Sequence, residues 1–325
     1  MTTLVTGGAG YIGSHTVYAL LDRGEQVVVM DNLSTGKKDL VAPAAAFVVG
    51  DVTDTELVKK TIADHRIDSV IHFAGSIVVP DSVIDPLGYY DNNVVKSRAL
   101  IATCVEMAVK HFLFSSTATV YAEDADQPLS EEARKAPVSP YARSKLMTEW
   151  VLEDVSRVTP LTHMTLRYFN VAGADAQGRT GQSAPKATHL IKRAAQVALG
   201  RIPQLDIFGT DYPTADGTGV RDYIHVTDLA AAHLLALAAL RAGAASTTYN
   251  VGYGRGLSVR QVITGVEYFT GRKLPVRESA RRLGDPPILI SDPSRLKTQL
   301  GWAPRHEDLK EIIRSAIDWE RRLNS

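Results

Sequence analysis

Cysteine is almost absent from this sequence, because Cys104 is the only one among 325 residues. No internal disulfide can form, and a chain without disulfides is typical of a reducing compartment. Cys104 lies in an apolar stretch with helical spacing, where we expect it to be a small core residue. The cysteine content therefore predicts a cytoplasmic protein.

Long apolar runs and an excess of charge are also missing. No apolar run approaches the roughly 20 residues of a membrane-spanning helix, and Met1 leads directly into an apolar segment without the basic region of a signal peptide. Lys and Arg together number 36, as do Asp and Glu, so charge favours neither nucleic acid nor an anionic membrane as partner. We expect a soluble protein with one large domain or two unequal ones.

Glycine, in contrast, is concentrated near the N-terminus, where residues 1–14 read MTTLVTGGAGYIGS. Residues 2–6 are apolar and β-branched, which predicts a buried strand, and apolar residues recur at helical spacing from Ile12 to Leu21. Between them, Gly7, Gly8, Gly10 and Gly13 would let the backbone approach a pyrophosphate, to which the helix N-terminus offers N–H groups. The segment predicts a dinucleotide-binding turn.

An acidic residue suited to a ribose follows the next predicted strand, residues 26–30. Asp31 stands eighteen residues after Gly13, where an acid is expected to meet the ribose 2′-hydroxyl. A carboxylate there would repel a 2′-phosphate, so the predicted cofactor is NAD. Lys37 and Lys38 leave NADP as the alternative, because either side chain could reach a phosphate.

Predicted strands and helices alternate through the first half of the sequence. The strands after residue 31 are 46–49, 69–73, 112–115 and 162–169, and the helices are 55–64, 86–109, 140–155, 188–199, 227–241, 258–270 and 308–323. This alternation predicts an α/β fold with a doubly wound parallel sheet. We expect a Rossmann-like NAD-binding domain at 1–170, on which 221–241 packs back, and a smaller α+β substrate domain at 171–325.

Tyr141 and Lys145 lie four residues apart in the segment YARSK, and hence on one face of a predicted helix. A tyrosine with a pKa of about 10 is a poor base at neutral pH, but a nearby ammonium and a nicotinamide cation would favour the phenolate. The hydroxyls of residues 115–119 should face the crevice at the carboxyl end of the sheet. Taken alone, the tyrosine and lysine more often mark a solvated helix face, and the hydroxyls can merely cap the strand end. Behind a dinucleotide-binding turn, the combination indicates a catalytic pair.

With LRYFN at 166–170 and DYPTADGTGVRDYIHV at 211–226, the sequence resembles the extended short-chain dehydrogenase/reductase family, and within it the nucleotide-sugar epimerases. The resemblance covers nearly the whole chain. It implies a bound NAD that is never released and the interconversion of UDP-galactose and UDP-glucose. In that reaction C4 is oxidised, the 4-keto sugar rotates, and the hydride returns to the other face.

The resemblance also implies roles for individual residues. Tyr141 would take the 4-hydroxyl proton, Lys145 would hold the nicotinamide ribose, and Thr117 would lie between them. The implied cofactor contacts are Gly7, Gly10, Tyr11, Ile12, Gly13, Asp31, Asn32, Asp51, Val52, Phe73, Ala74, Asn92, Tyr141, Lys145 and Tyr168. The implied substrate contacts are Thr117, Tyr141, Asn170, His189, Leu190, Arg221, Arg282, Asp285 and Leu289, and no metal is implied.

The two arginines of this set suit a diphosphate, because guanidinium groups bind phosphate oxygens bidentately. Either could instead pair with Asp222 or Asp285. Three residues depart from the family pattern: Thr117 replaces a serine, Ile77 replaces a lysine that contacts the cofactor, and Leu289 occupies the position whose size governs access of N-acetylated sugars. The loss of the lysine predicts weaker retention of NAD.

Three other functions compete with this interpretation. A 4,6-dehydratase would carry an acid pair after the active-site threonine, whereas Ala118 and Thr119 follow Thr117. An epimerase or decarboxylase of a UDP-uronic acid or a UDP-N-acetylhexosamine stays open. A non-catalytic NAD-sensing regulator usually lacks the tyrosine or the lysine, and both are present here.

The helices predicted at 93–109 and 141–155 are apolar on more than one face. The residues concerned are Leu100, Ile101, Cys104, Val105, Ala108, Met147, Trp150 and Val151. One apolar face must cover the sheet, so the remaining apolar residues predict a homodimer formed through these helices.

Overall fold

The computed structural model describes residues 1–184, 187–282 and 284–323. The chain forms two compact units, each built from segments that lie far apart in the sequence. The first unit contains 1–120, 137–167 and 230–249, and the second contains 121–136, 168–229 and the chain from residue 250 onward. This division does not say which ligand each unit binds, so the ligands assigned to 1–170 and 171–325 stay predictions.

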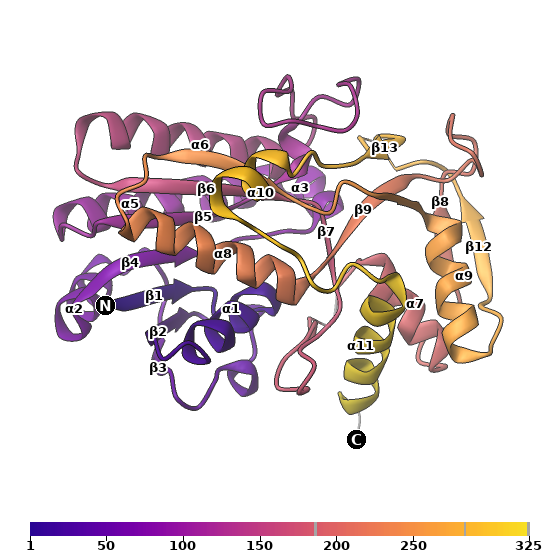
Figure 1. Ribbon diagram of the computed structural model, residues 1–325, viewed down its shortest axis with the longest axis horizontal. Coiled ribbons are helices and arrows are strands. Elements are labelled where there is room, and N and C mark those ends of the chain that lie inside the picture. The colour runs from indigo at the N-terminus through magenta and orange to yellow at the C-terminus, as the bar shows by residue number, and fades with distance from the viewer. Residues whose placement is uncertain (185–186, 283, 324–325) are drawn as a thin grey trace. The chain divides into compact units, whose positions relative to one another are not determined.

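A seven-stranded sheet forms the centre of the first unit (Figure 1). Its strands, in spatial order, are β10 (Thr247–Val251), β6 (Thr162–Tyr168), β5 (His111–Thr117), β4 (Ile67–His72), β1 (Thr2–Thr6), β2 (Gln26–Asp31) and β3 (Ala46–Val49). β1 pairs in parallel with both β2 and β4, and parallel pairing continues outward to β3 and β5. The predicted doubly wound, Rossmann-like α/β fold is thus confirmed.

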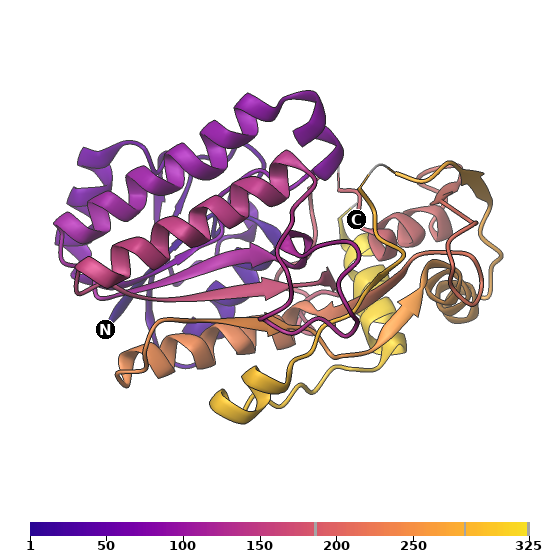
Figure 2. The ribbon, with the colours of Figure 1, turned by 90° about the horizontal axis from the view of Figure 1, so that it is seen from above.

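Helices cover both faces of this sheet (Figures 1 and 2). α2 (Thr55–His65), α5 (Lys96–Glu106) and α6 (Pro140–Val158) lie on one face, and α1 (Tyr11–Leu21) lies on the other with residues 230–241 of α8 (Val226–Arg241). Val27 through Met30 of β2 are all at most 4% exposed, as expected for a strand that is covered on both sides. Within the described ranges, every helix falls short of the length and apolar character needed to cross a bilayer.

The long helix predicted within 86–109 is present, but it contains a π-helical turn that the sequence does not reveal. The structure has α4 (Pro86–Tyr90), a π-helical turn at Asp91–Val95 and then α5, and a short α3 (Val79–Ile84) precedes them. In the π turn, Asn93 accepts a hydrogen bond from the Ser76 N–H (2.8 Å) and donates to the Ser144 hydroxyl (3.0 Å). A π turn adds one residue to a helix, and apolar spacing alone does not reveal it.

The apolar surplus predicted for the helices over the sheet is smaller than expected. Leu100, Ile101 and Cys104 are at most 1% exposed and pack in the core against β4 and β5 residues such as Phe112. They therefore belong to the face that covers the sheet, which the sequence alone did not separate from a second face. Exposed apolar side chains do remain on α6, at Met147 (36% exposed) and Trp150 (52% exposed).

The second unit is α+β, as predicted. Its strands are β7 (Asn170–Ala172), β8 (Leu205–Phe208), β9 (Val220–His225), β11 (Gly256–Ser258), β12 (Val276–Ser279) and β13 (Ile288–Leu289), and its helices include α7 (Leu190–Ala198), α9 (Val259–Thr270), α10 (Ser294–Leu300) and α11 (Leu309–Arg322). β9 is central, because β7, β11 and β13 all pair with it. This unit also contains β8, a strand that the sequence did not predict and that pairs in parallel with β12.

Candidate active site

The glycine-rich turn between β1 and α1 has no room for side chains. Gly7 has a φ of +72°, and a Cβ there would lie 2.6 Å from the Ala74 nitrogen and 2.8 Å from the Phe73 carbonyl carbon. A Cβ on Gly13 would lie 2.3 Å from the Gly7 carbonyl oxygen. Gly10 precedes α1 without a side-chain cap, so the helix start formed by Tyr11, Ile12 and Gly13 fits the pyrophosphate of a dinucleotide.

Asp31, at the end of β2, is held beside this turn. Its carboxylate accepts hydrogen bonds from the backbone N–H groups of Ala9 (3.0 Å) and Leu33 (2.8 Å). A carboxylate has about four acceptor positions, so capacity remains for the hydroxyls of a ribose. A Cβ on Gly36 would lie 2.9 Å from both carboxylate oxygens, so glycine keeps the approach to them open.

Two predicted cofactor residues, Asn32 and Asp51, are in direct contact. The Asn32 amide donates to the Asp51 carboxylate (3.0 Å), as do Lys96 (2.9 Å) and the Thr53 hydroxyl (2.8 Å). Partial burial opposes ionisation of Asp51, but these hydrogen bonds outweigh it and lower the pKa of the carboxyl to about 2. Val52 beside it is buried. Lys96 was not predicted, and no local sequence motif marks it.

Thr117, Tyr141 and Lys145 are brought together and buried, with exposures of 7%, 9% and 3%. Thr117 ends β5, and the other two lie in the first turns of α6, whose start is capped by Ser139. The Lys145 ammonium donates to the Ser115 carbonyl (3.0 Å) and lies 5.0 Å from the centroid of the Phe114 ring. The structure thus joins the predicted helix face to the predicted strand end.

Burial dominates the acidity of this group. It raises the pKa of Tyr141 to about 12, although hydrogen bonding with Thr117 lowers it. It lowers the pKa of Lys145 to about 8, although the charge of Glu149 raises it. In the chain alone burial sets both directions, because removal from water disfavours both the phenolate and the ammonium. The effect of Lys145 on the phenol stays a prediction.

The other residues predicted around the cofactor are less enclosed. Asn92, in the π turn, donates to the Ser76 hydroxyl (2.8 Å). Ile77, which stands in place of a lysine, is 51% exposed. Tyr168 is the last residue of β6 and is counted with the second unit.

In the second unit, Arg221 and Leu289 share one face of the β9 sheet. They are register partners between β9 and β13, and directly opposed residues point to the same side. The Arg221 guanidinium forms an ion pair with Asp285 and donates to the Val220 carbonyl (2.7 Å). Leu289 is 7% exposed. Arg221 and Asp285, both predicted to contact the substrate, are thus paired with each other, which is one of the alternatives that the sequence left open for Arg221.

Asn170 and Tyr223 extend this face. Tyr223 follows Arg221 by two positions on β9, so its side chain points to the same side, and Asn170 on β7 is its register partner. Tyr223 is 4% exposed and was not predicted. Its two-residue spacing from Arg221 in the segment VRDYIHV is the signal that marks it.

Of the remaining predicted substrate residues, Arg282 lies in the connection between β12 and β13, and His189 and Leu190 lie at the start of α7. The Arg282 guanidinium carbon is 3.7 Å from the centroid of the Phe208 ring, a cation–π contact. His189 and Leu190 begin α7, and the His189 ring nitrogen Nδ1 lies 3.4 Å from the Gln182 amide nitrogen. Burial, and next the charge of Lys192, lower the pKa of His189 to about 4, so its imidazole is neutral near pH 7.

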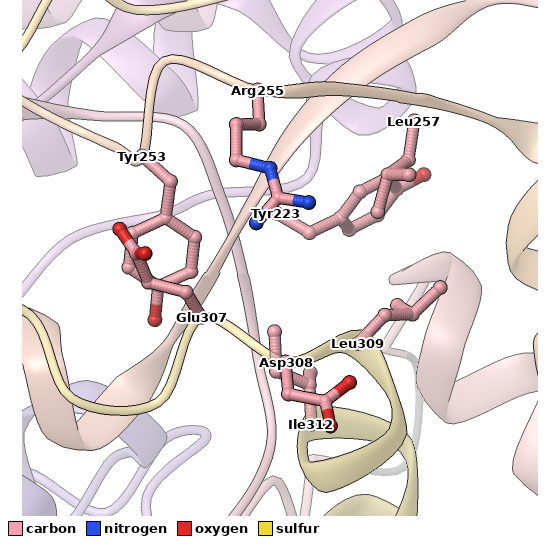
Figure 3. Close-up of a pocket in the computed structure, with 8 residues that line it drawn as sticks. All are labelled: Tyr223, Tyr253, Arg255, Leu257, Glu307, Asp308, Leu309 and Ile312. Carbon is pink, nitrogen blue, oxygen red and sulfur yellow. The ribbon is translucent and has the colours of Figure 1, made fainter.

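A cavity of about 390 Å³ also opens in the second unit (Figure 3). Its walls are Tyr223, Tyr253, Arg255, Leu257, Glu307, Asp308, Leu309 and Ile312. Among the described residues, none of those predicted for the cofactor or substrate site lines this cavity. Tyr223 connects this cavity with the predicted substrate residues, because it lines the cavity and lies on β9, the strand that carries Arg221.

Comparison with known proteins agrees with this geometry. The chain is 52% identical to a UDP-glucose 4-epimerase of Azospirillum brasilense over 98% of this chain and 92% of that one. The structure of UDP-glucose 4-epimerase from Brucella ovis in complex with NAD is 42% identical, with a TM-score of 0.94 over 98% of this chain and 97% of that one. The UDP-Glc/GlcNAc 4-epimerase of Campylobacter jejuni is 45% identical, with a TM-score of 0.86 and 99% coverage of both chains.

A family model supplies the last comparison. The model of the NAD dependent epimerase/dehydratase family matches residues 3–252, which include the glycine-rich turn, Thr117, Tyr141, Lys145 and Arg221. Because this match covers most of the sequence and the relatives span nearly all of it, the chain belongs to the NAD dependent epimerase/dehydratase family.

Proposed function

We propose that this protein is a NAD-dependent epimerase that interconverts UDP-galactose and UDP-glucose through a transient 4-keto sugar. The observation that carries the proposal is the buried group of Thr117, Tyr141 and Lys145 in the same unit as the glycine-rich turn. The relatives named UDP-glucose 4-epimerase support the choice of substrate.

The residues of the first unit fit NAD. The glycine-rich turn and the start of α1 would hold the pyrophosphate, and Asp31 has acceptor capacity for the ribose hydroxyls. Asn32, Asp51, Val52, Phe73, Ala74 and Asn92 would complete the contacts of this unit, and Tyr168, the last residue of β6, is also expected to contact the cofactor. When bound, NAD supplies the hydride acceptor for C4 of the sugar and a positively charged ring.

Tyr141 acts as the base in this proposal. Its phenol, hydrogen bonded with Thr117, takes the proton of the sugar 4-hydroxyl and later returns it. Because burial raises the pKa of Tyr141 to about 12, positive charge nearby must favour the phenolate. Lys145 supplies one such charge while it is protonated, and it also holds the nicotinamide ribose. The Thr117 hydroxyl orients the sugar oxygen.

The second unit binds the UDP-sugar. Arg221 and Arg282 bind the diphosphate, and Asn170, His189, Leu190 and Asp285 supply further contacts. UDP-N-acetylglucosamine is the second candidate substrate, because the relative from Campylobacter jejuni is named for both sugars. Leu289 argues against it as the preferred substrate, since its side chain is buried on the face of β9 that carries Arg221.

The deciding experiment measures conversion of UDP-galactose to UDP-glucose by the purified protein without added NAD. UDP-N-acetylglucosamine, UDP-glucuronic acid and their 4-epimers are assayed beside it under the same conditions. Turnover of UDP-galactose with the highest kcat/KM supports the proposal. A protein that binds NAD but converts none of these sugars is a sensor, and preference for a uronic acid identifies the alternative enzyme.

We also propose a cytoplasmic homodimer. Trp150 and Met147 expose apolar surface on α6, and a second copy would cover it by the same face. The single free thiol, Cys104, is buried, in keeping with a reducing compartment. Light scattering during gel filtration measures the mass, and a monomer at micromolar concentration, unchanged by Trp150→Glu, contradicts the dimer.

A further inference from the structure

A buried ion pair that the proposed chemistry does not use lies beside the active-site helix. Glu149 on α6 and Arg167 on β6 are 1% and 2% exposed at their side chains. Arg167 Nε donates to Glu149 Oε1 (3.0 Å), its NH2 group pairs with Oε2, and the Ser116 hydroxyl donates to Oε1. Buried ion pairs seldom add stability beyond what apolar residues would give, so packing alone does not explain this one.

The pair is placed next to Lys145. Glu149 follows Lys145 by four residues on α6, so the two side chains project from one face of the helix, one turn apart. The β5 segment that Glu149 touches through Ser116 is also the segment whose Ser115 carbonyl accepts the hydrogen bond from Lys145. Thr117 follows directly. Glu149 and Lys145 thus contact adjacent residues of β5, Ser116 and Ser115.

Groups from β5, β4 and α6 lie around the Lys145 ammonium, and the backbone after β4 also approaches it, because a Cβ on Gly75 would lie 3.6 Å from Lys145 Nζ. From β5 come the Ser115 carbonyl and the Phe114 ring. From β4 comes His72, which hydrogen bonds with the Thr6 and Ser97 hydroxyls. Burial, and to a lesser extent the charge of Lys145, lowers the pKa of His72 to about 3, so its imidazole is neutral. From α6 come Tyr141 and Glu149. The charge of Glu149 therefore counters the loss of hydration at the ammonium.

We propose that Glu149, held in place by Arg167 and Ser116, is a positioning residue that keeps the buried Lys145 ammonium charged and directed at the Ser115 carbonyl. Its catalytic meaning rests on the proposed function, in which a charged Lys145 favours the Tyr141 phenolate. Arg167 fixes the Glu149 carboxylate by bonding to both of its oxygens. Ser116 ties it to the strand that ends in Thr117.

Titration of Lys145 tests this inference without relying on turnover. The protein, with its cofactor as purified, is labelled with carbon-13 at the lysine Cε, and the Lys145 signal is identified by its loss in Lys145→Arg. Glu149→Gln removes the anion that favours the ammonium, so the pKa of Lys145 falls by about one pH unit. In the active enzyme, the alkaline limb of kcat/KM moves to lower pH by the same amount.

Two further variants separate charge from folding. Glu149→Gln removes the carboxylate that balances the Arg167 charge, so the double variant Glu149→Gln/Arg167→Gln, which removes both charges of the pair, is titrated as well and shows a smaller fall in the same direction. Glu149→Asp retains the charge and restores at least part of the shift. The matched control is Glu320→Gln, which removes a carboxylate of similar burial that pairs with Lys192 in the second unit, and it leaves the pKa of Lys145 unchanged.

An unchanged Lys145 pKa in both the single and the double variant overturns the inference, as does an equal fall in the Glu320→Gln control. Failure of the unmodified protein to convert UDP-galactose is a different outcome. It contradicts the proposed function, while the titration still decides whether Glu149 sustains the ammonium.

Discussion

Tyr141 shows how far burial can oppose the chemistry assigned to a side chain. The phenol lies 9% exposed beside Thr117, a geometry suited to proton transfer, yet burial raises its pKa to about 12. The ammonium beside it is weakened by the same effect, with a pKa of about 8. In the proposed mechanism the base therefore needs further positive charge, which oxidised NAD would supply.

Tyr141→Phe removes the hydroxyl and keeps the ring. Because general-base catalysis contributes about 10²- to 10⁴-fold, we expect kcat for UDP-galactose to fall by at least that range, with the fold and the NAD content retained. Thr117→Ser keeps the neighbouring hydroxyl and should be tolerated, whereas Thr117→Val should not. Near-normal turnover of Tyr141→Phe, measured with cofactor content matched, would exclude Tyr141 as the base.

Leu289 sets the substrate range if its buried side chain lines the sugar pocket. An acetamido group forced into a packed site costs about 1–3 kcal/mol, or roughly ten- to a hundredfold in specificity. We expect UDP-glucose and UDP-galactose to be preferred. Leu289→Ser should raise kcat/KM for UDP-N-acetylglucosamine selectively, and Leu289→Tyr should abolish that activity.

The control for this prediction is the neighbouring residue of β13. Ile288 points to the opposite face of the sheet from Leu289, so Ile288→Ser should leave the ratio of kcat/KM values unchanged. Equal values for plain and acetylated sugars in the unmodified protein would show that Leu289 does not gate the pocket.

Among the elements, the turn between β1 and α1 has the least tolerance for change. Gly13→Ala would place a Cβ 2.3 Å from the Gly7 carbonyl oxygen, so the backbone must move away from the position that fits a pyrophosphate. We expect the purified variant to lose most of its nucleotide, measured by absorbance after denaturation. Gly24→Ala, also in the first unit, meets no atom within 4 Å but has a φ of +77°. It should lose some stability and retain its nucleotide, and retention by Gly13→Ala would contradict the assignment of the turn.

The sequence predicts elements best where one pattern decides their structure. β1, β3 and α2 lie within one residue of their predicted bounds because strand and helix periodicities are clear there. The π turn at Asp91–Val95 was missed, since it depends on Asn93 bonding to Ser76 and Ser144, contacts that only the tertiary structure creates. For the same reason the sequence does not predict Lys96, whose position becomes informative through a hydrogen bond to Asp51. Tyr223 could have been found from its two-residue spacing from Arg221, once that segment is taken as a strand.

For the whole molecule, the identity of the bound cofactor is the clearest test. Asp31 lies beside the turn with acceptor capacity left for ribose hydroxyls, and its charge would repel a 2′-phosphate. We expect nucleotide released from the purified protein by denaturation to be NAD, identified by chromatography. NADP as the main product would contradict this and would point to Lys37 and Lys38 as its ligands.

The segmented make-up of the first unit affects how it is made on the ribosome. β6 ends at Tyr168, but β10, its neighbour at the edge of the sheet, is complete only at Val251. Translation at about 5–20 residues per second separates the two by roughly 4–16 s. During that interval β6 is an open edge, which invites pairing with other nascent chains. A chaperone that shields this strand should therefore matter more for the yield of folded protein than for the stability of the finished fold.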